Sequence, residues 1–513
     1  MNVLTLHYGH NGSVTVSKNY KLIVHTELER FSKVKYSEKV ADTLIKKINN
    51  LNIFFDLIVI SHWEENTLND NFYLNFNRNK NCLIILENDK YPHHFYHALC
   101  ASYNTDINFD KIIVIDGNGK IKNNLFEIES IYDNNLKEIK KVYFEKHVSL
   151  GWAYQTISLA LGLKNEFEAG KVMAFSTFGK IKKNIYKKLY VHNNFNVKYF
   201  PHKINSYNKK AALDLHKNLT TNKTDDFSKN YVRTFQKISE NHCVNFFKDI
   251  KNEKIILTGG FCQNVLINTS LTKKTKNKIY ADPMCNDQGI SLGMNFFYTH
   301  KKLKRENSIY LGFEPDYKDL ECLFKNFKIV SSNEEEISNI LINEPVALFQ
   351  GRSEQGQRGL GNRSLLIDAT NLKAIQKINL IKKREWYRPF ACSILEENMK
   401  DWFIVDNDRC PYYMMFVFKA KKNKIKKINS VISKDRTCRL QAVTPNHNLN
   451  YYNLIKSFYK KTKIPLLLNT SLNLPGETIV EDLNDLKNMF INSSLKYAWL
   501  PDIKKLIIKY DRS

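Results

Sequence analysis

Residues 254–268 read KIILTGGFCQNVLIN, and this stretch decides the fold class. Residues 254–257 have the apolar pattern of a buried strand, residues 258–260 form a glycine turn, and residues 261–268 have helical spacing. The succession recurs along the chain. Strands are predicted at residues 57–61 and 111–116, and helices at residues 148–163, 231–249 and 288–300. Strands that alternate with helices predict α/β layers around a mixed sheet.

A second α/β pattern follows the polar stretch KKLKREN at residues 301–307, which predicts a linker. We expect strands at residues 345–350, 411–418 and 464–469, helices at residues 372–381 and 453–461, and a turn followed by a helix at residues 480–488. The sequence therefore predicts two domains, residues 1–305 and 306–513.

Composition narrows the class of protein. The 513 residues are 43% hydrophobic and 25% charged, which is typical of a globular chain. No apolar run reaches the roughly 18–20 residues of a membrane helix, and the N-terminus lacks the pattern of a signal peptide. The nine cysteines are scattered, which excludes a disulfide scaffold or zinc ribbon and favours a cytoplasmic location.

The chain is strongly basic. Its 78 Lys and Arg against 52 Asp and Glu give a net charge of +26. This balance is compatible with a nucleic-acid partner, but a lysine-rich solvated surface is the favoured interpretation.

Two histidines lie four residues apart in PHHFYHA, residues 92–98. On a helix, His93 and His97 share one face, so both imidazoles can reach one metal ion. Asp116 ends a predicted strand and Asp287 precedes a predicted helix, and they would add two carboxylates. This mixed set suits iron, manganese or zinc. The alternatives are core histidines and, for Asp287, a helix N-cap.

Glycine turns offer a second kind of site. Gly259 and Gly260 stand between a strand and a helix, where backbone N–H groups can approach a phosphate or ribose. Lys171 follows Gly170 and would add a positive charge. Ordinary turns are the alternative for each of them.

The second half carries a cluster of arginines in glycine-rich segments. Three stand in GRSEQGQRGLGNRS, residues 351–364, as Arg352, Arg358 and Arg363. Lys382, Arg384 and Arg388 stand in KKREWYRPF, residues 382–390. Arginine forks match phosphate oxygens, and glycines allow close backbone approach. Arg439 and Ser471 can complete a phosphate pocket.

These segments, in this order, resemble the NodU/TobZ-type O-carbamoyltransferase family along nearly the whole chain. The resemblance also rests on ELERFSK (27–33), GKVM (170–173), FQGR (349–352) and NTS (469–471). It implies an actin-like ATPase-type domain that binds a metal, residues 1–305. It also implies a YrdC-like α/β domain that binds carbamoyl phosphate and ATP, residues 306–513.

The resemblance implies a chemistry too. Carbamoyl phosphate and ATP give carbamoyl adenylate, and the carbamoyl group passes to a hydroxyl of a small molecule, such as a natural product or a sugar. The metal would be Fe(II) or another divalent ion held by His93, His97, Asp116 and Asp287, and magnesium is a candidate companion of ATP. His10 is the candidate base, because imidazole titrates near neutrality. The remaining site residues expected are Lys382 and Arg388 as catalytic groups and, for the substrates, Arg358, Arg439, Ser471, Asn469, Gly259, Gly260, Asn264 and Lys171.

Several positions depart from the family pattern, and one of them is Leu472, which stands where a phenylalanine is usual. Asn11 stands where an aspartate is usual, and Gln357 and Gly359 replace a proline and an alanine. A tRNA-modifying carbamoylation enzyme and a divergent, non-catalytic binding module remain alternatives. We expect neither a membrane nor a nucleic-acid partner.

Overall fold

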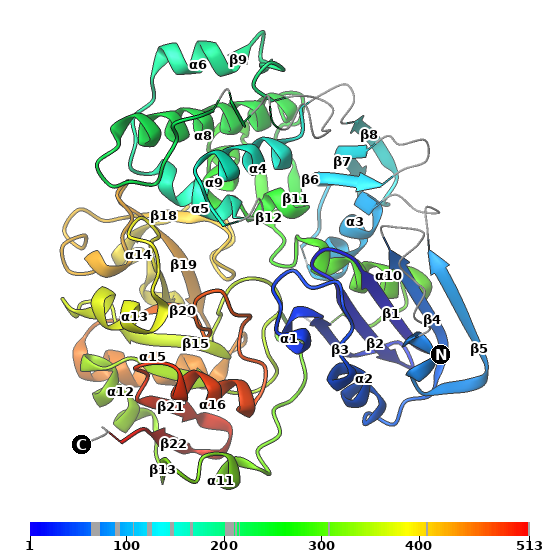
Figure 1. The fold of residues 1–513 in the computed structure, drawn as a ribbon, viewed down its shortest axis with the longest axis vertical. Coiled ribbons are helices and arrows are strands. Elements are labelled where there is room, and N and C mark those ends of the chain that lie inside the picture. The colour runs from blue at the N-terminus through cyan, green and yellow to red at the C-terminus, as the bar shows by residue number, and fades with distance from the viewer. Residues whose placement is uncertain are drawn as a thin grey trace.

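The computed structural model describes residues 1–62, 72–87, 93–105, 107–120, 126–143, 148–164, 168–200, 210, 213–214, 216–305, 308–406 and 409–510. Its mixed α/β class agrees with the sequence (Figure 1). Residues 306 and 307 of the predicted linker lie outside this description.

Two five-stranded sheets in the first half repeat one topology. The first has the order β3-β2-β1-β4-β5, with antiparallel pairing among β1–β3 and parallel pairing of β1 with β4 and of β4 with β5. The second, β8-β7-β6-β11-β12, has the same directions. This repeated topology agrees with the actin-like arrangement that the resemblance implies. The strands are β1 (Asn2–Tyr8), β2 (Ser13–Lys18), β3 (Lys21–Glu27), β4 (Phe55–His62), β5 (Arg78–Glu87), β6 (Lys111–Lys120), β7 (Phe126–Asp133), β8 (Glu138–Tyr143), β11 (Lys254–Thr258) and β12 (Lys278–Ala281).

Helices join the two sheets. Helix α3 packs on α10 and on β6, while α10 packs on β1 and β2, so this pair lies between the repeats (Figure 1). Helices α8 and α9 pack together beside the second sheet. The elements are α1 (Glu29–Ser32), α2 (Asp42–Asn49), η1 (Phe72–Asn75), α3 (His93–Tyr103), α4 (Leu150–Ala160), α5 (Ala169–Ser176), α6 (Lys183–Leu189), β9 (Tyr190–Val191), β10 (Asn194–Phe195), α8 (Asp226–Phe246), η3 (Gly260–Gln263), α9 (Val265–Thr275), η4 (Asp287–Gly289) and α10 (Ile290–Tyr298).

A ten-stranded sheet forms the second half, in the order β13-β22-β21-β14-β15-β20-β16-β19-β18-β17. Its mixed strands and the helices around it agree with the α/β class predicted for residues 306–513. The strands are β13 (Lys328–Ser331), β14 (Val346–Phe349), β15 (Arg363–Asp368), β16 (Ala391–Leu395), β17 (Phe403–Ile404), β18 (Val417–Ala420), β19 (Thr437–Val443), β20 (Leu466–Ser471), β21 (Tyr497–Leu500) and β22 (Lys505–Ile508). The helices are α11 (Leu320–Leu323), α12 (Glu334–Asn343), α13 (Ala374–Lys382), α14 (Met399–Trp402), α15 (Leu449–Thr462) and α16 (Leu483–Ile491), with short turns η5 (Glu396–Asn398), η6 (Asn429–Val431) and η7 (Pro501–Ile503).

Two predicted elements are wrong in detail. The strand expected at residues 411–418 begins only at Val417, because Met414 has a φ of 56° and interrupts the extended chain. Asp116 does not end its strand, since β6 continues to Lys120. Between Ile115 and Gly119 the pairing with β7 shifts register, and such an irregularity re-aims side chains out of the ladder.

The named strands of the two halves belong to different sheets. The first two large sheets end at Ala281 and the ten-stranded sheet begins at Lys328. The boundary between residues 305 and 306 falls in this interval and stays a prediction.

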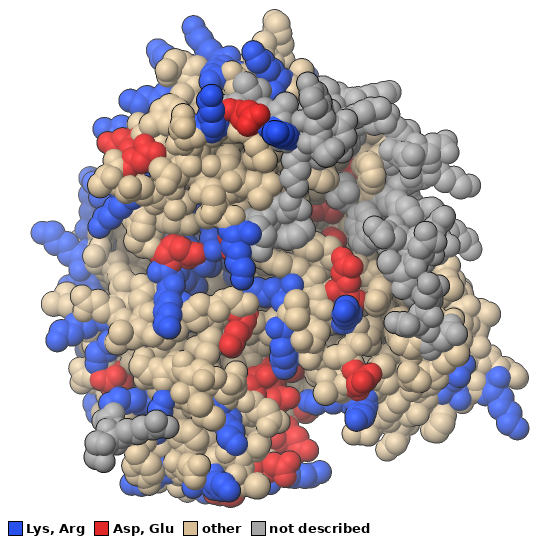
Figure 2. Space-filling view, viewed as in Figure 1, with Lys and Arg blue, Asp and Glu red and all other residues tan. Residues whose placement is uncertain are grey.

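Charge on the face seen in Figure 2 is mixed. Lysine and arginine are spread over it, with aspartate and glutamate among them. A lysine-rich solvated surface accounts for this distribution on the viewed face. Among the described residues, no helix combines the length and the apolar character that crossing a membrane requires.

Candidate functional site

Four buried side chains meet between the two sheet repeats: His93, His97, Asp116 and Asp287. Each offers one ligand atom, and these atoms all lie within 4.8 Å of one another. The two Nε2 atoms are 3.0 Å apart. The structure therefore brings the four predicted side chains together.

Three separate elements, α3, β6 and η4, supply the four residues of this cluster. His93 and His97 occupy successive turns at the start of α3, as their spacing predicts. Asp116 comes from the irregular part of β6, and the N–H of Gly260 donates to its Oδ1 at 3.1 Å. Asp287 opens η4, just before α10.

The two carboxylates of the cluster lie close enough to the two imidazoles to change their charge. The Oδ2 of Asp116 and the Oδ1 of Asp287 lie 3.3 Å from the Nε2 of His93. Burial opposes an imidazolium, but the two carboxylates prevail and raise the pKa of His93 to about 10. Two carboxylates and two neutral imidazoles would carry two negative charges, so the cluster attracts positive charge.

His10 lies on the loop between β1 and β2. Its ring stacks on Tyr36, with centroids 5.2 Å apart and planes at 22°. Next to it, the His7 ring lies 6.1 Å from that of His93. Burial lowers the pKa of His7 to about 3 despite the nearby Asp287 carboxylate. The charge of His10 contributes to lowering the pKa of His7, so the two histidines of this segment lie near each other.

A cavity of about 910 Å³ opens between the two halves of the chain. Tyr36 and Gly260 line it, so its wall adjoins both His10 and the Asp116 carboxylate. Among the residues that the structure describes, ten basic side chains line it against four glutamates. The basic ones are Lys33, Lys35, Lys164, Lys171, Arg358, Lys382, Lys383, Arg384, Arg388 and Arg439, and the acidic ones are Glu29, Glu168, Glu385 and Glu477.

The basic residues of the second half crowd one another. Burial and the neighbouring Arg388 lower the pKa of Arg384 to about 9. The pKa of Arg439 is held well below its usual range by burial and then by Arg358. Within the described residues, the Arg439 guanidinium has no hydrogen-bond or ion-pair partner, so this cluster favours an anionic ligand.

The side chain of Lys382 is held by the end of β20 and by the residues just after it. Its Nζ donates to the carbonyls of Ser471 and Asn473, each at 2.8 Å. The ammonium is thus fixed at the cavity wall, where burial keeps its pKa well below the usual value. Ser471 and Asn469 line the same wall.

Several predicted residues have other contacts. Gly259 does not line the cavity; its φ of 89° lets it pack on Ile115, where a Cβ would lie 2.3 Å from the carbonyl oxygen. Asn264 lines the cavity, but its side chain also accepts from Ile267 N and caps α9. Lys171 is paired with Glu168 and with Glu385.

Only one arginine of residues 351–364 lines the cavity, and it is Arg358. Arg363 is fully buried and donates to the backbone carbonyls of Gln350 and Gly351. Arg352 donates to the carbonyls of Ile23 and Leu311. Spacing alone did not separate these two supporting arginines from the one in the cavity.

Two contacts of the REWYRPF segment were not predicted. Trp386 packs edge-on against Phe178 of the first half, with ring centroids 4.8 Å apart. Glu385 joins Lys171 of the first half to Arg388. The segment therefore fastens the two halves together while Arg384 and Arg388 line the cavity. The mixture of aromatic and charged residues in this segment is the feature of the sequence that could have indicated a contact between the two halves.

The chain is similar to known proteins along most of its length. The chain matches the family models described as carbamoyltransferase N-terminus, over residues 80–295, and carbamoyltransferase C-terminus, over residues 337–506. An uncharacterized protein of Methanocaldococcus jannaschii, MJ1051, is 30% identical, over 94% of this chain and 96% of its own length. Nodulation protein NolO of Bradyrhizobium diazoefficiens is 28% identical, over 79% of this chain and 76% of its own. Component A of Acidaminococcus fermentans (R)-2-hydroxyglutaryl-CoA dehydratase gives a TM-score of 0.34 at 12% identity, over 59% of this chain and 100% of that one.

Proposed function

The chain belongs to the carbamoyltransferase family, and from this premise we propose that it is an ATP-dependent O-carbamoyltransferase. Carbamoyl phosphate, ATP and water would give carbamoyl adenylate, phosphate and pyrophosphate. The carbamoyl group then passes to a hydroxyl of a small molecule, and AMP leaves. The single observation that carries the proposal is the cation-lined cavity whose wall adjoins the His93–Asp287 cluster.

The two donor substrates fit the charge of the cavity. Carbamoyl phosphate and ATP are both anions, and each displaced group carries negative charge as its bond breaks. Arg358, Arg388 and Arg439 converge there, so we assign them to phosphate groups. Lys382 adds a fixed ammonium next to Ser471. Fixed cations in a buried site stabilise such charge without rearranging during the reaction.

The histidine–aspartate cluster fits a divalent metal. Its two nitrogen and two oxygen ligand atoms are buried and close together, and without a cation they place like-charged carboxylates side by side. We assign His93, His97, Asp116 and Asp287 as the residues that would hold the ion, with iron a candidate. When bound, such an ion supplies Lewis acidity toward a carbonyl oxygen.

His10 is assigned as the base for the acceptor hydroxyl. It is held by stacking on Tyr36, a residue of the cavity wall. A base must lie within reach of the proton it removes, and a hydroxyl bound against Tyr36 would meet that condition. Asn11 follows His10 and has a φ of 56°, which is a left-handed backbone conformation. It places an amide where the family usually has a carboxylate.

Pyrophosphate release provides the test. Purified, metal-loaded protein should release pyrophosphate from ATP only when carbamoyl phosphate is present, and an added hydroxyl acceptor should gain one carbamoyl group by mass spectrometry. Pyrophosphate release that ignores carbamoyl phosphate would rule the proposal out. The tRNA-modifying alternative predicts instead that tRNA is the acceptor, with binding that weakens steeply as salt rises.

A further inference from the structure

The loop that carries Arg358 is held by two charged residues of the first half. Glu27, the last residue of β3, accepts a hydrogen bond from Gly356 N through Oε1 at 2.8 Å. Arg30 of α1 donates from Nη2 to the carbonyls of Glu354 and Gly356, at 3.2 and 3.3 Å. The two side chains lie 3.6 Å apart and both are buried, Arg30 completely.

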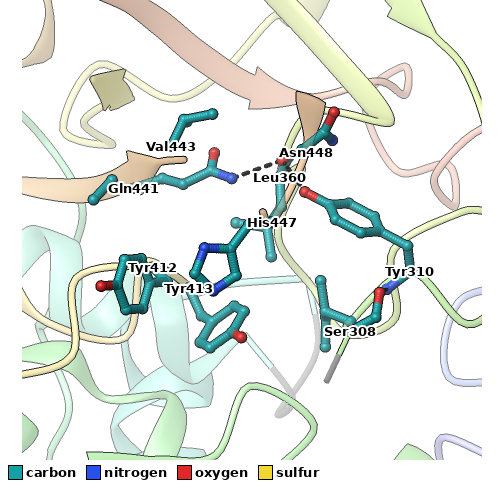
Figure 3. A pocket seen from close by; sticks show the side chains of 11 residues that line it. Ser308, Tyr310, Leu360, Tyr412, Tyr413, Gln441, Val443, His447 and Asn448 are labelled. Carbon is teal, nitrogen blue, oxygen red and sulfur yellow. Dashed lines mark hydrogen bonds between the residues drawn. The ribbon is translucent and has the colours of Figure 1, made fainter. Parts of the chain in front are cut away.

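The same loop is held from inside by Glu354. Its Oε1 accepts from the N–H groups of Leu360 and Arg363 at 2.6 and 3.1 Å. The carbonyl of Leu360 accepts in turn from Gln441 Nε2 at 2.7 Å, the dashed contact in Figure 3. Arg358 therefore lies between two fixed points, Gly356 on one side and Leu360 on the other.

Gly356 sits close to the segment that leads to Asp287. Its φ is 94°, and a Cβ there would lie 2.8 Å from the carbonyl oxygen of Pro283. The clamp on Gly356 thus sets the position of the Arg358 loop relative to the first half, where the metal cluster lies. Arg358 itself contacts that half through Gln263 O at 3.4 Å.

We propose that Glu27 and Arg30 are positioning residues for the carbamoyl phosphate site. Neither side chain lines the cavity, so they act through the backbone of residues 354–356 and fix where Arg358 meets the donor phosphate. This inference rests on the proposed function. Holding a reacting group in place contributes strongly to rate and affinity, and a misplacement of about 1 Å costs about 100-fold.

The test replaces Glu27 in the full chain by Met, which keeps the length of the side chain but removes the acceptor of the Gly356 N–H. We expect the KM for carbamoyl phosphate to rise about 10- to 100-fold, with a much smaller change in kcat and unchanged metal content. Glu27→Gln keeps an acceptor oxygen and should restore a KM near that of the parent. Arg30→Lys should raise the KM as Glu27→Met does.

The matched control is Glu240→Met. Glu240 is as buried as Glu27, at 7% against 6% exposed, and it too pairs with an arginine, Arg233, at 3.3 Å. Its variant should keep the parental KM. A parental KM in Glu27→Met, or an equal rise in Glu240→Met, overturns the inference. Should Glu27→Met fail to fold, the double variant Glu27→Met/Arg30→Met removes both charges together and replaces it in the test.

A failure of the proposed function gives a different result. In that case the parent itself consumes no carbamoyl phosphate, and inorganic phosphate becomes the probe. Calorimetric titration with phosphate should then show weaker binding in Glu27→Met than in Glu240→Met. Equal phosphate affinity in the two variants would contradict the positioning role on its own.

Discussion

The Nε2 atoms of His93 and His97 face each other at 3.0 Å on one side of α3. Two imidazole nitrogens at this distance share either a proton or a cation. The oxygen of Asp287 lies 3.3 and 3.4 Å from the same two atoms, and that of Asp116 lies equally near. A buried group of this composition is built to hold positive charge between the two sheets.

We expect Asp287→Asn to lose the metal. The substitution keeps the shape of the side chain but removes one of two carboxylates, so metal affinity should fall by more than the ~10–100-fold that outer-shell partners typically contribute. Metal content after purification, together with the rise in Tm on adding Fe(II), Mn(II) or Zn(II), measures this.

His216→Asn is the control for that loss. His216 is another buried histidine, but it bonds to Tyr231 and to the carbonyl of Tyr199. Its variant should bind metal like the parent. Parental metal content in Asp287→Asn would remove the metal centre from the proposal.

Arg439→Met should abolish turnover while it stabilises the fold. Burial and the neighbouring arginines, Arg358 first, disfavour its charge, so removing that charge relieves repulsion. The free energy of unfolding should rise by ~0.5–2 kcal/mol, the range typical of a single stabilising substitution. Thermal melts and pyrophosphate release on one sample measure the two effects.

Arg363→Met provides the opposite case. Arg363 is fully buried, whereas Arg439 is partly buried, and Arg363 donates to the carbonyls of Gln350 and Gly351 and stacks 4.0 Å from the Phe349 ring. Leaving those carbonyls unpaired costs ~1–3 kcal/mol each, so this variant should melt lower. Destabilisation of both variants alike would show that Arg439 supports the fold rather than a ligand.

Local patterns predicted the parts of the structure that depend on neighbouring residues. The strand and turn at residues 254–260 are present, and the helix that follows begins at Val265, four residues later than predicted. The i, i+4 spacing of His93 and His97 placed both rings on one face. The Glu27–Arg30 pair was outside the reach of such patterns, because its partners stand more than 320 positions away in the sequence. Met414 shows the same limit, since nothing local predicts its left-handed backbone.

Stability should depend on pH through Glu27. Burial raises the pKa of its carboxyl from 4.5 to about 7, against the pull of Arg30. A raised carboxyl pKa stabilises the fold fully below the unfolded value, and the stabilisation is lost as pH rises toward 7. The Tm of the parent should therefore fall between about pH 5 and 7 by more than that of Glu27→Gln, which cannot ionise. Parallel Tm profiles for the two proteins would contradict this.

Gly359→Ala tests the departure from the family pattern at the arginine loop. An added Cβ would lie 2.7 Å from the Cα of Ser471 and 2.9 Å from the carbonyl oxygen of Arg363, both backbone atoms that cannot yield easily. Alanine should therefore push the loop away from β20, cost ~1–3 kcal/mol in unfolding free energy and raise the KM for carbamoyl phosphate. Gly170→Ala, where a Cβ meets nothing within 4 Å, is the stability control and should leave the Tm unchanged or higher. If Gly359→Ala melts like the parent and keeps its KM, the loop tolerates the alanine by moving as a unit, and the close fit between Gly359 and Ser471 plays no part in donor binding.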